Sequence, residues 1–150
     1  MIRFSAMWEH CYRAGLGLLF PPRCACCQIE LPTDAELMLC ADCCQQLIGS
    51  AGSFCVRCGA IEPGEPGGVH GCRLCGSTRF HFEKVVALGL YDGPLHQAVA
   101  KIKEPAGRVL AAALAQLMLR TRGEQLKALE ADLVVPVPMF WAKRFWRGFN

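Results

Sequence analysis

Apolar and polar positions alternate in two distinct ways along the second half of the chain. Residues 83–91 hold a short run of Val and Leu, which predicts a β-strand. After a turn at residues 91–94, apolar residues recur at helical spacing from Pro94. This pattern predicts a helix that ends at a break over residues 104–107, where Pro and Gly interrupt it.

The same helical spacing returns from about residue 108 to residue 120, and Gly123 just beyond it is a typical stop signal. A short charged helical stretch is predicted over residues 124–130. Residues 132–138 are then continuously apolar, as in a strand buried within a parallel sheet. Strand, helices and buried strand together predict the opening of an α/β domain.

The N-terminal residues 1–22 carry a modest apolar segment interrupted by Glu9, His10 and Arg13. This favours a short amphipathic helix over a signal peptide. The longest strongly apolar stretch, residues 109–119, is shorter than the roughly 20 residues that a membrane span needs. We therefore expect no transmembrane helix and a cytoplasmic location, where cysteines favour metal binding or catalysis over disulfides.

Cysteine content changes the picture of the first half, because 11 of the 150 residues are cysteines. Most of them fall into four C-x-x-C pairs, and two such pairs on a short loop supply the four thiolates of a tetrahedral zinc site. The pairs are Cys24 with Cys27, Cys40 with Cys43, Cys55 with Cys58, and Cys72 with Cys75. They predict two Zn2+ sites with complete thiolate ligand sets, which is typical of a structural role.

Spacing alone leaves the grouping of the pairs open. Neighbouring pairs are favoured because a shorter loop costs less entropy to close, but an interleaved arrangement is an alternative. Cys26 precedes the predicted ligand Cys27 and Cys44 follows the predicted ligand Cys43, so a register shift of one residue is also open. Cys11 is interpreted as a small buried apolar residue. A disulfide framework is disfavoured because no signal peptide precedes the pairs, and a redox C-x-x-C motif would be a single pair.

Residues 24–75 are rich in Gly, Pro and polar residues, so we expect the metal ions to replace a hydrophobic core there. Metal also changes the charge balance. Eight thiolates and two Zn2+ ions together add −4, which turns the formal net charge of +3 into about −1. The overall charge therefore gives no argument for a nucleic-acid partner.

The last residues, 139–150, interleave aromatic side chains with Lys143, Arg144 and Arg147. Three interpretations remain open from the local chemistry. The segment is suited to an anion-binding loop after a strand, to a surface for single-stranded nucleic acid, and to an ordinary amphipathic helix.

Four further motifs give the chain a resemblance to a known family. They are Leu-Phe-Pro-Pro-Arg-Cys at 19–24, Leu-Tyr-Asp-Gly-Pro-Leu at 90–95, Val-Val-Pro-Val-Pro at 134–138 and Arg-Gly-Phe-Asn at 147–150. With the paired cysteines, they make the chain similar to the ComF family of amidophosphoribosyltransferase-like proteins, which are associated with natural competence and DNA utilisation. The resemblance implies a double zinc ribbon over residues 23–78, followed by α/β structure over 79–150, the N-terminal part of a type I phosphoribosyltransferase-like fold.

The same resemblance implies a substrate, phosphoribosyl pyrophosphate (PRPP) held with Mg2+, and competence or DNA-processing proteins as partners. Lys143, Arg144, Arg147 and Gly148 would correspond to the loop that meets the pyrophosphate. Lys103 matches a helix-end motif of the family, although Glu104 stands where the family has an aromatic residue.

The acidic pair and the Thr/Gly-rich turn of type I enzymes do not occur before Asn150. We therefore expect a C-terminally truncated family member, a fragmentary gene model or a gene remnant. No catalytic residue is assigned, this chain is expected not to turn over substrate, and Mg2+ with PRPP is expected only in full-length relatives. The alternative is a non-enzymatic zinc-ribbon interaction module or a single-stranded nucleic-acid-binding module.

Overall fold

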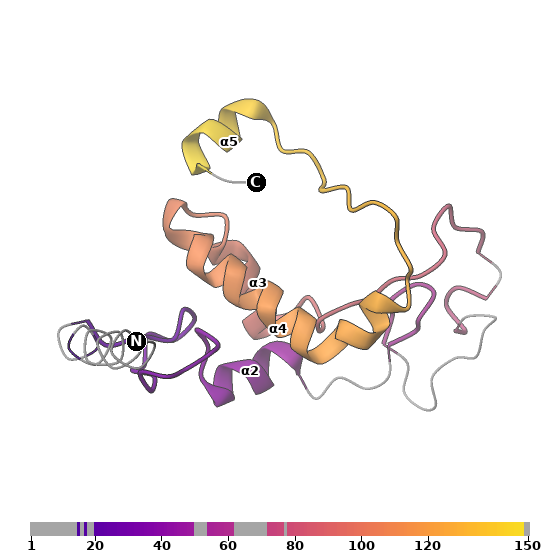
Figure 1. Ribbon diagram of the computed structural model, residues 1–150. Coiled ribbons are helices and arrows are strands. Elements are labelled where there is room, and N and C mark those ends of the chain that lie inside the picture. The colour runs from indigo at the N-terminus through magenta and orange to yellow at the C-terminus, as the bar shows by residue number, and fades with distance from the viewer. Residues whose placement is uncertain are drawn as a thin grey trace, which may run out of the picture.

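A computed structural model describes residues 15, 17, 20–49, 54–61, 72–76 and 78–148. Within these ranges the regular elements are helices: α2 (Ala41–Ile48), α3 (Gly93–Lys101), the short 3₁₀ helix η1 (Pro105–Gly107), α4 (Arg108–Lys127) and α5 (Trp141–Arg147). Helix α3 contacts both α2 and α4, and a long irregular segment leads from α4 to α5 (Figure 1). The amphipathic helix predicted for residues 1–22 lies for the most part outside the described residues.

The predicted start of α3 is confirmed. Asp92 caps the helix, because its carboxylate accepts a hydrogen bond of 2.7 Å from the backbone N–H of Gly93. Pro94 follows in the first turn, where its missing N–H costs nothing. The predicted break is confirmed as well, since η1 separates α3 from α4. Its buried Gly107 lies so close to Ile102 that an added Cβ would sit 2.5 Å from the Ile102 Cα.

The predicted helix stop at Gly123 is wrong, because α4 continues to Lys127 and includes the first four residues of the stretch 124–130 predicted as a separate helix. A glycine inside a helix costs only about 1 kcal/mol relative to alanine. Neighbouring contacts offset this cost: the Arg122 side chain donates to the Ala87 carbonyl at 3.1 Å and lies over the Phe54 ring. No helix in the described part of the chain, α4 included, is long and apolar enough to cross a membrane.

The two predicted strands, residues 83–91 and 132–138, are irregular in the structure. A strand is stable when its N–H and C=O groups form a series of hydrogen bonds with a neighbouring strand. Neither segment forms such a series with the other described residues. The Val85 N–H donates one hydrogen bond of 3.0 Å to the Val56 carbonyl. Val134 is 85% exposed, so the expected burial of the second segment is also wrong. The described residues thus hold helices and two isolated bridges, but no sheet.

The buried side chains form two separate clusters. The larger cluster joins the cysteine-rich segment to α3 and α4, and consists of Cys24, Leu37, Leu39, Cys43, Leu47, Leu95, Ala98, Leu110, Ala113, Leu114 and Leu117. At its edge, Arg120 of α4 forms an ion pair of 2.8 Å with Glu36. The smaller cluster consists of Cys55, Cys72 and Cys75, flanked by Cys58, Ala60 and Phe80. Cysteines of the first two C-x-x-C pairs therefore belong to the main core, whereas those of the last two pairs form a separate satellite cluster.

Candidate metal centres

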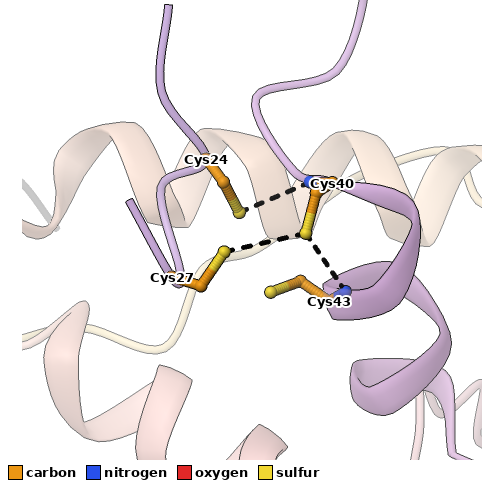
Figure 2. A group of neighbouring side chains, drawn as sticks. All are labelled: Cys24, Cys27, Cys40 and Cys43. Atoms are coloured by element: carbon orange, nitrogen blue, oxygen red, sulfur yellow. Dashed lines mark hydrogen bonds between the residues drawn. The ribbon is translucent and has the colours of Figure 1, made fainter. Parts of the chain in front are cut away.

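The first four-cysteine group forms where a turn meets the start of α2. Cys24 and Cys27 lie on the turn, Cys40 is the N-cap of α2, and Cys43 lies in its first turn (Figure 2). All four sulfur atoms lie within 4.8 Å of one another. The helix cap and the metal ligand set are thus built from the same residues, because the Cys40 sulfur also accepts a hydrogen bond of 3.4 Å from the Cys43 N–H.

The second group brings together Cys55, Cys58, Cys72 and Cys75, again with all sulfur atoms within 4.8 Å of one another. Neighbouring pairs therefore share a group in both cases, and the interleaved alternative is not formed. Cys26 and Cys44 belong to neither group and pack half-buried against the main core, so the ligand register is the one that the spacing predicts. Cys11 lies outside the described residues.

Several of the sulfur–sulfur separations are close to those that a tetrahedral zinc ion requires, and all lie within 4.8 Å. Zn–S bonds of about 2.3 Å place the corners of a tetrahedron about 3.8 Å apart. The measured separations are 3.7 Å for Cys27 and Cys40, 3.8 Å for Cys55 and Cys75, 3.6 Å for Cys58 and Cys72, and 3.7 Å for Cys72 and Cys75. A disulfide would need about 2.05 Å, and the described cysteines are all free. The two groups could hold two zinc ions, each with four thiolates and no position left for water.

The leading cysteine pair of each group has the same backbone fold. In the first group the Cys24 N–H donates to the Ile29 carbonyl and the Gln28 N–H donates to the Cys24 carbonyl, both at 2.8 Å. The same two bonds recur in the second group, from Cys55 to Ala60 and from Gly59 to Cys55, also at 2.8 Å. These hydrogen bonds close each turn and aim both sulfurs of a pair to one side.

Both turns end on a residue in the left-handed region, Gln28 with φ of 65° and Gly59 with φ of 76°. A side chain there costs roughly 1–2 kcal/mol, which glycine avoids. We expect Gln28→Gly to raise the free energy of unfolding of the zinc-loaded protein by about 0.5–1 kcal/mol, net of the added chain entropy. Denaturant titration measures this change. Gln45→Gly, in the exposed middle of α2, should instead lower stability by about 1 kcal/mol, and equal losses in both variants would contradict the argument.

Backbone donors favour the thiolate form of Cys24. Burial alone would raise the pKa of this thiol, but N–H groups of Cys27, Cys40 and Cys26 point at the sulfur and lower the pKa to about 6. The Cys40 N–H bond to the Cys24 sulfur measures 3.4 Å and is drawn in Figure 2. Such donors stabilise a metal-bound thiolate in the same way.

The second group shows the same effect at Cys55, where the N–H of Cys58 is the main cause of a pKa lowered to about 6. Burial and the neighbouring thiols, Cys40 first among them, raise the pKa of Cys43 in the first group. Backbone donors therefore favour the thiolate form of one sulfur in each group, whereas burial favours the protonated thiol at Cys43. A divalent cation that binds here displaces those protons and satisfies all four sulfurs.

Three of the four predicted pyrophosphate-binding residues, Lys143, Arg144 and Arg147, lie on α5, a helix where a loop was expected, and Gly148 is its C-cap. Lys143 and Arg147 line a hollow of about 270 Å³ together with Lys103, Pro105 and Trp146. The structure thus brings Lys103 to the two predicted cations from a distant part of the chain.

Arg144 and Gly148 lie apart from that hollow. They line a neighbouring one with Trp141 and Phe145. Gly148 adopts φ of 74° at the C-terminal end of α5, and its carbonyl accepts a bond of 3.1 Å from Arg108 of α4. This position therefore anchors the helix end, and the predicted four-residue set is divided between two surfaces.

Sequence reasoning did not identify Arg57 as part of the second group. Its side chain donates to the carbonyls of Cys75 at 3.2 Å and Thr78 at 2.8 Å. The signal in the sequence was weak: Arg57 and Arg73 are the two arginines that follow Cys24 within the cysteine-rich segment, and Arg57 sits inside a C-x-x-C pair.

Comparison with known proteins finds one relevant similarity. The chain is 31% identical over 143 residues to the DNA utilization protein YhgH of Salmonella typhimurium, an alignment that covers 89% of this chain and 58% of that protein. The chain therefore spans less than two thirds of the length of this relative. No family model matches the chain, and no solved structure matches it. Most of the chain is thus similar to part of a DNA utilization protein, and its eight paired cysteines fit a double zinc ribbon.

Proposed function

We propose that this chain is a ComF-like zinc protein of DNA utilisation, in which two structural zinc ions hold a double zinc ribbon in front of a phosphoribosyltransferase-like segment. The observation that carries the proposal is the convergence of eight cysteines into two four-sulfur groups, in which all sulfurs lie within 4.8 Å of one another. The similarity to a protein named for DNA utilization supports the biological role.

Zinc in these groups would supply cross-linking and not chemistry. Four thiolates fill the coordination sphere, so no position remains to activate water or polarise a substrate. The residues of the chain orient those thiolates through the backbone donors described above and through the helix cap at Cys40. In the described residues, the groups that could hold a metal consist of cysteines alone, and no carboxylates gather as a Mg2+ site would need.

The zinc content and the activity of the whole chain test this proposal. Native mass spectrometry should find two zinc ions per chain, and isotope-labelled PRPP with Mg2+ should not be hydrolysed by these 150 residues. Chains that carry no zinc after expression and refolding with zinc would refute the structural role. Measurable PRPP turnover would refute the absence of activity while leaving the zinc assignment intact.

A second candidate function is binding of single-stranded nucleic acid. It is supported by the hollow at which Lys103, Lys143 and Arg147 surround the exposed Trp146. Cations that follow a phosphate backbone, together with a ring on which a base stacks, are the usual elements of such a surface. The proximity of Lys103 is what distinguishes this hollow from an ordinary exposed helix face.

Replacing Lys103, Lys143 and Arg147 together with alanine should weaken binding of an oligothymidylate at least tenfold. Loss of three phosphate contacts should also reduce the slope of log K against log salt by about 2. Fluorescence anisotropy over a range of salt concentrations measures both quantities. The matched triple replacement of Arg79, Lys84 and Lys127, which are exposed elsewhere, should change affinity less than threefold, and equal losses in the two variants would reject a localised surface.

A further inference from the structure

The side chain of Arg57 crosses from one cysteine pair of the second group to the other. Arg57 belongs to the Cys55–Cys58 turn, but its guanidinium donates to the Cys75 carbonyl at 3.2 Å and to the Thr78 carbonyl at 2.8 Å. The first acceptor belongs to a cysteine of the group itself, and the second lies just beyond it. One side chain therefore fixes the distance between the two turns whose sulfurs must meet.

An aromatic stack holds this guanidinium in place. Its carbon lies 5.7 Å from the centre of the Phe80 ring, and Phe80 stacks on Phe82 with 4.7 Å between ring centres. A planar guanidinium can donate two hydrogen bonds in fixed directions while lying on a ring, which an ammonium group cannot do. The arrangement is specific to arginine.

The second group depends more than the first on a side chain that links its two turns. In the first group, Cys40 and Cys43 begin α2, and Leu47 of that helix is 1% exposed within the main core. In the second group, the buried cluster is three cysteines flanked by Cys58, Ala60 and Phe80. Among the described residues, little apolar burial keeps its two turns together, so directional polar contacts matter more.

We propose that Arg57 is the positioning residue of the second metal centre: it holds the Cys55–Cys58 and Cys72–Cys75 turns within reach of one zinc ion and thereby slows the release of that ion. The first centre, anchored by α2, is independent of it. This inference rests on the proposed binding of two zinc ions.

Release of zinc from the full-length chain to an excess of a chromogenic chelator tests the proposal. We expect two kinetic phases of one zinc each, with the faster phase assigned by its absence from Cys75→Ser. Arg57→Ala should accelerate this phase at least tenfold and leave the slower phase unchanged within twofold. Arg79→Ala removes the same charge from an exposed site nearby and should change neither phase more than twofold.

A conservative variant separates positioning from charge. Arg57→Lys keeps the charge but lacks the planar guanidinium that donates two hydrogen bonds in fixed directions. It should release zinc at a rate closer to that of Arg57→Ala than to that of the parent. In the Co2+-loaded protein, Arg57→Lys should also alter the thiolate charge-transfer absorption of one metal equivalent out of two.

The possible results divide clearly. Equal acceleration of both phases, or no acceleration of either, would overturn the role of Arg57. A parent protein that binds no zinc would instead refute the proposed function itself. If Arg57→Ala does not fold, the same comparisons on Arg57→Lys decide between the outcomes.

Discussion

Complete removal of zinc should unfold the helical core as well as the cysteine-rich loops. Cys24 and Cys43 are 0% and 6% exposed and belong to the same buried cluster as the leucines of α4. A structural zinc site contributes roughly 10–16 kcal/mol of apparent binding free energy, which is comparable to the whole stability of a typical domain, about 5–15 kcal/mol. The core leucines cannot offset a loss of this size.

Far-ultraviolet circular dichroism before and after chelation measures the effect. The helical signal should fall by more than half, and protease resistance of α4 should be lost. Re-addition of zinc in slight excess should restore both, whereas Mg2+ should not, because thiolates bind it poorly. Retention of the helical signal in a sample proven free of metal would contradict the coupling between the first centre and the core.

The two centres should differ when a single ligand is replaced. Cys43→Ser removes a ligand on α2, the helix that contacts α3, so the damage should reach the main core. Cys75→Ser acts on the satellite cluster and should leave that core in place. We expect amide exchange in α4 to accelerate at least 100-fold in Cys43→Ser, equivalent to about 3 kcal/mol, and less than threefold in Cys75→Ser.

Hydrogen exchange followed by mass spectrometry resolves the two regions in one experiment. Cys44→Ser is a matched control beside Cys43, because Cys44 is half-buried but lies outside both groups. It should retain two zinc ions and near-parental exchange in α4. Equal acceleration in Cys43→Ser and Cys75→Ser would show that the two centres stabilise one cooperative unit.

The expectation that metal replaces a hydrophobic core holds for only one of the two groups. Around the second group the buried side chains among the described residues are mainly the cysteines themselves. Around the first group, Leu37, Leu39 and Leu47 pack with leucines of α4, which lie far away in the sequence. Composition counts the apolar residues of a segment, but it does not reveal what a distant segment brings to cover them.

Features that depend on near neighbours in the chain were determined by the sequence. The C-x-x-C spacing defined the eight ligands and their four pairs, since a turn of this length directs two sulfurs to one side. Asp92 followed by Pro94 defined the start of α3, and residues 104–107 defined its end. Each of these outcomes is set by hydrogen bonds and backbone angles within a few residues.

Features that depend on distant partners were decided by the tertiary structure alone. Residues 132–138 have the composition of a strand, but a strand exists only with a neighbour that accepts and donates its hydrogen bonds. Gly123 remains helical because contacts from Arg122 to Phe54 and Ala87 offset its weak propensity. Arg57 reaches the Cys72–Cys75 turn, and Lys103 lines one hollow with Arg147, only because the folded chain brings these segments together. Local chemistry therefore determined the ligands, and long-range packing determined how much of the protein each metal centre supports.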